Sequence, residues 1–235
     1  MTRLTHTIQL DAKIQARNYY YHIAVGMALA TAVLFWWIFG RVELSYVIPM
    51  FFLFGIGGTT LLLVGALVLF EKRENTLQSL VVTPLRPTEY INSKIISLSL
   101  LAILEATLIT LLSYVVRYGL DFNLLLLAAG AIVTGAMHTL IGLILVVRHQ
   151  QINSFLLPLV AVALVLQLPA ANLFGFTFYP FYLIPTQGPL LLLQAAFQPE
   201  AVATWQLLFG LVASAGWLVV FYVWALRAFE KHILG

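Results

Sequence analysis

Long apolar runs alternate with short polar segments along this chain, and six of the runs are long enough to cross a membrane as helices. Crossing the hydrocarbon takes about 20 mostly apolar residues. The predicted spans are Tyr19–Phe39, Leu44–Phe70, Ile95–Val116, Phe122–Val147, Ile152–Leu168 and Val202–Leu226. This pattern predicts an all-α integral membrane protein in which residues 1–235 form a single transmembrane domain.

The N-terminal segment 1–18 precedes the first span and differs from it in composition. It carries three basic residues, while Leu10 and Ile14 share one helical face. These features are typical of an interfacial helix whose basic side faces lipid phosphates. A cleaved signal peptide is not expected, because the apolar run that follows is longer than a signal-peptide core.

The longest polar interruption is the stretch 71–94, which lies between the second and third spans. It holds four of the twelve basic residues and three of the nine acidic ones, so we expect a water-exposed loop. Apolar residues recur in it at three- and four-residue spacing, which predicts a short amphipathic helix. The residues of that apolar face are Leu77, Leu80 and Val81.

The ends of this predicted loop helix carry recognisable signals. Asn75 can act as its N-cap. Thr83 precedes Pro84, which disfavours helical angles at Thr83 and ends the helix. Pro87 followed by Glu89 is typical of the first turn of the next helix.

The loop resembles the cytoplasmic loop of the ABC-2 type of ABC-transporter membrane subunit, through Glu71–Leu77 and Leu80–Leu85. In that family an acidic, basic and Gly-Thr-Leu run leads into a Thr-Pro-Leu turn, and the loop carries a coupling helix that docks on the ATPase subunit. Asn75 stands here where the family has Gly. The resemblance implies that the following residues couple to an ATPase: Glu71, Arg73, Glu74, Thr76, Leu77, Leu80, Val81, Thr83 and Pro84.

The resemblance also implies the partners of the chain. ATP and magnesium would bind a separate ATPase, with no cofactor or nucleic acid held by this chain. Family members work with twelve spans, so six imply a dimer, most simply a homodimer, in membrane lipid. The run Leu10–Tyr21 is similar to small members of the family described as drug exporters.

Composition excludes a soluble globular domain. The chain is 62% hydrophobic and 9% charged, with a mean hydropathy of +0.98, whereas soluble domains are about 25% charged. Cysteine is absent, so disulfide and thiolate metal sites are excluded.

The distribution of charge predicts the orientation. With six spans, both termini and the loop 71–94 fall on one side, together with ten of the twelve basic residues. Only Arg41 and Arg117 face the other side. Because basic residues concentrate on the cytoplasmic side, we expect cytoplasmic termini and a location in the cell (inner) membrane.

The region 169–200 is apolar and aromatic, but five prolines interrupt it. Prolines at that density exclude a straight span. Irregular backbone at membrane depth must be shielded by protein or line a cavity, so we expect an outer re-entrant or cap-like pair of short helices before the last span. The family has such a hairpin at this place. A plain amphipathic outer loop is the alternative.

Motifs for catalysis are missing, and two ionisable residues lie deep in the spans. The sequence has no GxxxxGK[ST], GxSxG or HExxH motif, so an enzyme is not expected. Glu105 in the third span and His138 in the fourth have similar predicted depths and can form an intramembrane pair. They are interpreted either as a hydrogen-bonded clasp between helices or as a proton relay.

Three functions are compatible with these patterns. The leading hypothesis is the membrane subunit of an ATP-driven exporter of hydrophobic or amphipathic substrates, such as drugs or lipids. The second is an ion-coupled secondary transporter that uses Glu105 and His138. The third is a membrane scaffold that transports nothing.

Overall fold

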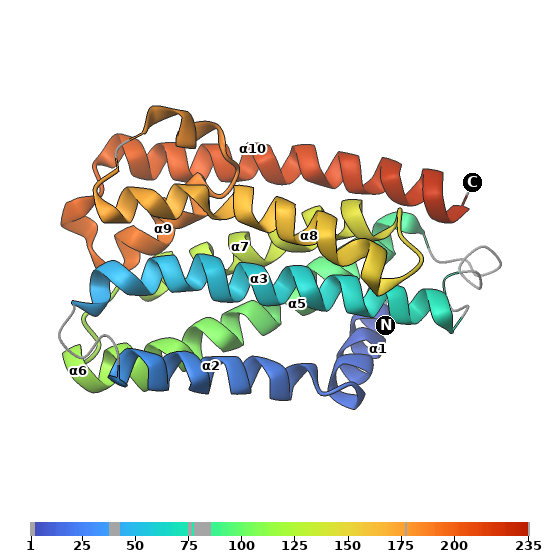
Figure 1. Cartoon of the computed structure of the whole chain (residues 1–235), viewed down its shortest axis with the longest axis horizontal. Helices are drawn as coiled ribbons and strands as arrows, with labels where there is room; N and C mark the ends of the chain where they lie inside the picture. The colour runs from blue at the N-terminus through green and yellow to red at the C-terminus, as the bar shows by residue number, and fades with distance from the viewer. Residues whose placement is uncertain (1–2, 38–42, 75–76, 78–85, 177, 235) are drawn as a thin grey trace.

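The computed structural model describes residues 3–37, 43–74, 77, 86–176 and 178–234, and these form an all-α bundle (Figure 1). Six described helices are long and apolar enough to cross a membrane, which confirms the predicted fold class. They are α2 (Tyr20–Trp37), α3 (Leu44–Arg73), α5 (Pro87–Ile109, continuing to Tyr118), α7 (Leu124–Val146), α8 (Ile152–Gln167, continuing to Asn172) and α10 (Thr204–Phe229, continuing to Ile233).

The two ends of the bundle differ in what they hold. Both termini, the end of α3 and the start of α5 lie at one end, here called the terminal end (Figure 1). The connection from α5 to α7 and the region before α10 lie at the opposite end, here called the cap end. This arrangement is the one that six crossings predict, while the cytoplasmic orientation of the terminal end stays a prediction.

Two large apolar clusters fill the bundle. One lies toward the terminal end and includes Leu67, Ile91 and Phe155. The other lies toward the cap end and includes Phe52 and Phe197, whose ring centroids are 5.9 Å apart. Helices α3 and α7 contribute to both clusters and pack against each other, so they form the centre around which the other helices are arranged.

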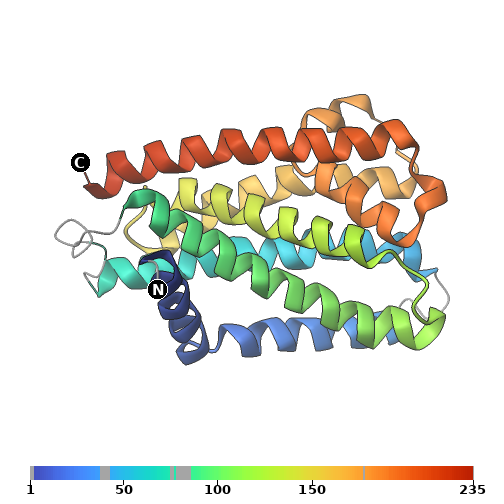
Figure 2. The same cartoon turned by 180° about the vertical axis from the view of Figure 1, so that it is seen from behind.

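Helix α1 (Arg3–Arg17) lies across the terminal end, roughly perpendicular to the bundle (Figures 1 and 2). The chain turns between α1 and α2 at Tyr19, which has a positive φ of 62°. One face of α1 packs on α5, and it is a polar face. Asp11 and Gln15 are buried there, and Gln15 Nε2 donates to Ser97 Oγ at 2.9 Å. The sequence predicted an apolar face with Leu10 and Ile14 and did not predict this polar contact, and Leu10 is exposed.

Helix α5 begins at Pro87, as the Pro87 and Glu89 signal predicted. The backbone N–H of Arg86 donates to Glu89 Oε2 at 2.9 Å, which caps the first turn. The helix therefore begins before the predicted span at Ile95, within the stretch 71–94. Near the cap end α5 widens into a π-helical segment, η1 (Thr110–Val115), and ends in α6 (Val116–Tyr118).

The region before α10 contains no straight span. It consists of the 3-10 segments η2 (Leu168–Phe174) and η3 (Tyr179–Leu183), the helix α9 (Gln187–Phe197) and a third 3-10 turn, η4 (Pro199–Ala201). At 11 residues, α9 is too short to cross a membrane, and it packs against α3, α7 and α10. Glycines let α9 approach α10 closely, because a Cβ atom at Gly188 would lie 2.9 Å from the carbonyl oxygen of Gly210.

Candidate functional site

A lysine and two carboxylates are buried together at the terminal end. Lys94 Nζ on α5 lies 2.5 Å from Asp11 Oδ1 on α1 and 2.5 Å from Glu71 Oε1 on α3. The side chains are 1% exposed for Lys94, 3% for Asp11 and 9% for Glu71. One cation thus joins three helices at the base of the α3–α5 connection, and these three residues are called the ionic cluster below.

Hydroxyl groups on α5 complete the hydrogen bonding of the two carboxylates. Tyr90 Oη donates to Glu71 Oε2 at 2.6 Å, and Ser93 Oγ donates to Asp11 Oδ2 at 2.5 Å. Taking charges out of water costs several kcal/mol per ion, and only close pairing with further hydrogen bonds offsets that cost. The arrangement meets this condition, because both oxygens of each carboxylate accept a hydrogen bond.

The ionic cluster corrects the prediction of a water-exposed loop at both ends of the stretch 71–94. Glu71 lies in the last turn of α3, and Lys94 lies in the second turn of α5. Both are buried because each neutralises the other. The sequence carries a signal for this burial. Asp11 and Gln15 are four residues apart, so they share one face of α1. Tyr90, Lys94 and Ser97 follow one another at spacings of four and three residues, so they share one face of α5.

A second lysine fixes the end of α3 to the end of α7. Lys72 Nζ donates to the carbonyl oxygens of Val147 at 2.8 Å and His149 at 2.7 Å, with Val146 at 3.2 Å. The last carbonyls of a helix have no partner within it, so this ammonium caps the C-terminus of α7. The α3–α5 connection therefore starts from a helix end that is tied to α1, α5 and α7.

The predicted coupling residues divide into three groups. Glu71 belongs to the ionic cluster, and Arg73 and Glu74 are exposed at the end of α3. Leu77 is 3% exposed and packs in the apolar cluster of the terminal end, so its expected place on an outward-facing apolar surface is wrong. Packing on the bundle removes this side chain from water within the chain itself. The remaining residues lie outside the described part of the chain: Thr76, Leu80, Val81, Thr83 and Pro84.

The intramembrane residues Glu105 and His138 are both buried, but they do not hydrogen-bond to each other as a clasp would. Thr59 Oγ1 on α3 donates to Glu105 Oε2 at 2.9 Å. His138 Nδ1 lies 2.8 Å from the carbonyl oxygen of Thr134 and donates to it, because a carbonyl oxygen only accepts. Glu105 Oε1 and His138 Nε2 have no hydrogen-bond partner among the described residues.

The backbone of α3 explains this correction. A Cβ atom at Gly57 would lie 2.5 Å from His138 Nε2, and one at Gly55 would lie 3.8 Å from Glu105 Oε1. Both ionisable side chains thus face one glycine-containing segment of α3. Matching depths in the neighbouring helices α5 and α7 predicted a contact between the two side chains. Instead, both side chains pack against α3, which the depth argument did not consider. Within the described residues no group of three His, Cys, Asp or Glu side chains could hold a metal ion.

Comparisons with known proteins agree with a transport role for this bundle. A model of the fluoroquinolones export permease protein family matches residues 2–235. Two relatives described as fluoroquinolones export permease proteins, from the Mycobacterium tuberculosis strains CDC 1551 / Oshkosh and ATCC 25618 / H37Rv, are each 34% identical over 216 residues. The alignments cover 90% of this chain and 88% of each relative.

Proposed function

Because this chain belongs to the fluoroquinolones export permease protein family, we propose that it is the membrane subunit of an ATP-driven ABC exporter of the ABC-2 type. In this proposal a separate ATPase polypeptide binds ATP and magnesium, and two copies of the present chain form the transport path. The termini lie in the cytoplasm, and the substrate moves outward across the cell membrane. The substrate class is a hydrophobic or amphipathic drug such as a fluoroquinolone, in keeping with the names of the relatives.

The observation that carries the proposal is the ionic cluster at the base of the α3–α5 connection. Lys94 ties α5 to α1 and α3 through the two carboxylates, so a displacement of the connection is shared by three helices. An ATPase that pushes on this end of the bundle would therefore move α1, α3 and α5 together. Replacing a buried charge network by apolar residues is often neutral or even stabilising, so stability alone does not require the ionic cluster, and we interpret it as a coupling device.

The docking surface follows from which side chains are free at the terminal end. Arg73 and Glu74 at the end of α3 and Arg86 before α5 are exposed and charged. Such residues suit contact with a soluble partner, whereas the buried Leu77 holds the start of the connection against the bundle. We propose that the ATPase contacts the exposed charges together with the part of the connection that includes Leu80 and Val81.

The test is ATP-dependent transport by the chain together with an ATPase subunit. The chain is co-expressed with a candidate Walker-motif ATPase from the same genome, purified and reconstituted into liposomes, and uptake of a fluoroquinolone is followed after ATP addition from the ATPase side. We expect uptake that requires both subunits and hydrolysable ATP. Uptake that is driven by an ion gradient in the absence of the ATPase would overturn the proposal.

Charge reversals locate the docking surface. Arg73→Glu and Glu74→Arg are expected to lower the yield of co-purified ATPase and ATP-driven uptake together, because each places a repulsive charge at the interface. The matched control is Asp121→Arg, which reverses an exposed charge at the cap end. Equal yields of ATPase with all three variants would place the docking surface elsewhere.

A further inference from the structure

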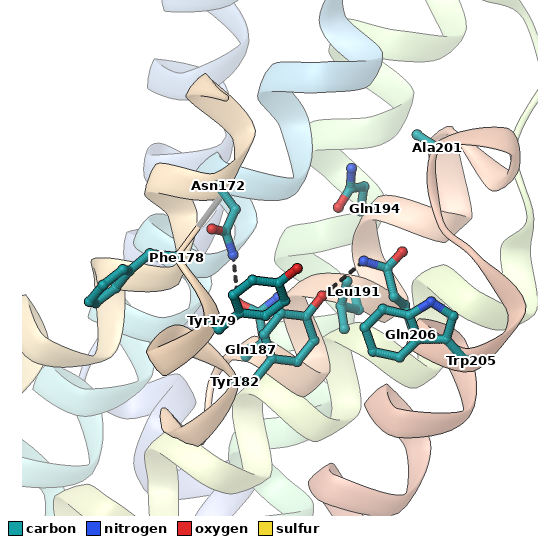
Figure 3. A pocket seen from close by; sticks show the side chains of 10 residues that line it. All are labelled: Asn172, Phe178, Tyr179, Tyr182, Gln187, Leu191, Gln194, Ala201, Trp205 and Gln206. Atoms are coloured by element: carbon teal, nitrogen blue, oxygen red, sulfur yellow. Dashed lines mark hydrogen bonds between the residues drawn. The ribbon is translucent and has the colours of Figure 1, made fainter. Parts of the chain in front are cut away.

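A cavity of about 300 Å³ opens at the cap end, between η2, η3, α9 and the start of α10 (Figure 3). It is separate from the ionic cluster, which lies at the terminal end. Its volume lies at the lower limit of the ~300–1,000 Å³ typical of small-molecule sites. None of the ten residues that line it carries a charge. A ligand with a net charge would leave that charge unpaired in the cavity, so the lining favours a ligand without one.

Aromatic rings form one part of the lining. The rings of Tyr182 and Trp205 are stacked, with centroids 5.7 Å apart and planes at 23°. Tyr179 and Phe178 from the same turn region contribute two further rings, and both are exposed. Aromatic rings favour offset stacking or edge-to-face packing with other rings, so this part of the cavity suits a flat aromatic ligand.

Side-chain amides form the other part. Figure 3 shows Asn172 and Gln194 above the rings of Tyr179 and Tyr182 in that view. The Nδ2 atom of Asn172 donates to Gln187 Oε1 at 3.1 Å, while its Oδ1 atom is buried with no hydrogen-bond partner among the described residues. Buried polar atoms in proteins are nearly always hydrogen-bonded, so the amide of Asn172 keeps one unsatisfied acceptor beside the cavity.

The sequence of α9 shows that these amides are not ordinary surface residues. The helix is otherwise apolar, yet Gln187, Leu191 and Gln194 recur at four- and three-residue spacing and all line the cavity. The side chain of Gln194 forms no hydrogen bond with another described residue. Exposed Tyr and Trp side chains are common at membrane interfaces, where they anchor a protein. Such anchoring does not explain two glutamines on a helix that packs inside the bundle.

We propose that this cavity binds a planar aromatic compound without net charge, with its ring against Tyr182 and Trp205 and polar groups on its edge hydrogen-bonded to Asn172 and Gln194. Aromatic contact then supplies most of the affinity, and the amides orient the ring. Export substrates would occupy the cavity at the end opposite the proposed ATPase docking surface. The inference rests on the proposed function for this role and for the choice of probe.

Binding is measured on the purified full chain in detergent, without ATPase or ATP, by isothermal titration calorimetry with a fluoroquinolone as the probe. Trp205→Leu is expected to weaken binding about tenfold, since it removes the stacked ring. The matched control is Trp224→Leu on the same helix, because Trp224 is 48% exposed, close to the 57% of Trp205, and lies outside the cavity. Melting temperatures check that both variants fold. Equal affinities of the two variants would overturn the proposal.

A second variant tests the chemical class. Gln194→Leu is expected to weaken fluoroquinolone binding about fivefold while leaving binding of naphthalene, a flat aromatic without polar edge groups, unchanged. Equal losses for both probes would contradict recognition of a polar-edged aromatic.

The outcomes separate this site from the export proposal. A Trp205→Leu chain that binds and exports like the unmodified one rejects the cavity and leaves ATP-driven export standing. If binding depends on Trp205 but export needs no ATPase, the ligand site in the cavity is supported and the proposal of ATP-driven export is rejected.

Discussion

Lys94 on α5 and Asp11 on α1 form a buried ion pair between helices that are far apart in the sequence, with Nζ and Oδ1 2.5 Å apart. The same ammonium contacts Glu71 at the end of α3. Two buried carboxylates thus depend on one cation, and removing that cation leaves both of them without a counter-charge. The contribution of Lys94 to stability should therefore exceed that of any exposed lysine in the chain.

Replacing Lys94 with Met should destabilise the bundle by about 3–5 kcal/mol, the usual cost of breaking a buried pair from one side. The measurement is thermal unfolding of the detergent-solubilised chain. Lys13→Met is the matched control, because Lys13 is an exposed lysine on α1. The triple variant Asp11→Asn, Glu71→Gln and Lys94→Met removes all three charges and should recover much of the loss. A Lys94→Met chain that melts like Lys13→Met would show that the pair is not formed.

Hydropathy predicted the spans well, because each helix that faces lipid must carry an apolar run of fixed minimum length. The observed starts of α3 and α8 coincide with the predicted ones at Leu44 and Ile152. The boundaries around the α3–α5 connection were less accurate, since charge was taken to mean exposure. Glu71 and Lys94 show why this fails, as opposite charges can be buried together once a fold brings them into contact.

The candidate site was harder to predict than the spans because its contacts are long-range. Asp11 pairs with a residue in a different span, and nothing local in the sequence specifies that partner. Glu105 and His138 were assigned to each other from equal depth in two consecutive spans, whereas Thr59 and Gly57 on α3 are the residues that they face. A hydrophobic pattern gives the depth of a residue and the face it occupies, but leaves open which helices are neighbours.

The orientation of the bundle can be tested in this cysteine-free chain by adding single cysteines at exposed positions. Glu74→Cys and Lys231→Cys lie at the terminal end and Asp121→Cys at the cap end. The basic residues at the terminal end predict that it is cytoplasmic. In intact cells an impermeant thiol reagent should label only Asp121→Cys, and permeabilised cells serve as the control. Labelling of Glu74→Cys from outside would reverse the orientation.

Gly57 should be intolerant of even one added methyl group. In Gly57→Ala the new Cβ atom would lie 2.5 Å from His138 Nε2, so the imidazole or the helices must shift, at a typical cost of about 1–3 kcal/mol. Gly58→Ala is the matched control, because a Cβ atom there would have no described atom within 4 Å apart from its chain neighbours and the nearby backbone of its own helix. Alanine favours a helix over glycine, so Gly58→Ala should melt at the same temperature or higher.

The double variant Gly57→Ala and His138→Ala identifies the clashing group. Removing the imidazole makes room for the methyl group, so the second substitution should cost less in the Gly57→Ala background than in the unmodified chain. Additive losses in melting temperature would show that His138 does not pack against α3 at this residue.

Glu105 should be energetically coupled to Thr59 and independent of His138. The hydroxyl of Thr59 donates to Glu105 Oε2 at 2.9 Å, so Thr59→Val and Glu105→Gln should be non-additive in stability by about 0.5–3 kcal/mol, the range for residues in contact. Thr134→Val is the matched control for the loss of a buried hydroxyl, since Thr134 Oγ1 donates to the carbonyl oxygen of Gly130. Glu105→Gln with His138→Ala should add within about 0.5 kcal/mol, because no hydrogen bond joins the two residues. A larger coupling between Glu105 and His138 would restore the clasp between α5 and α7, and would require a different packing of α3 between them.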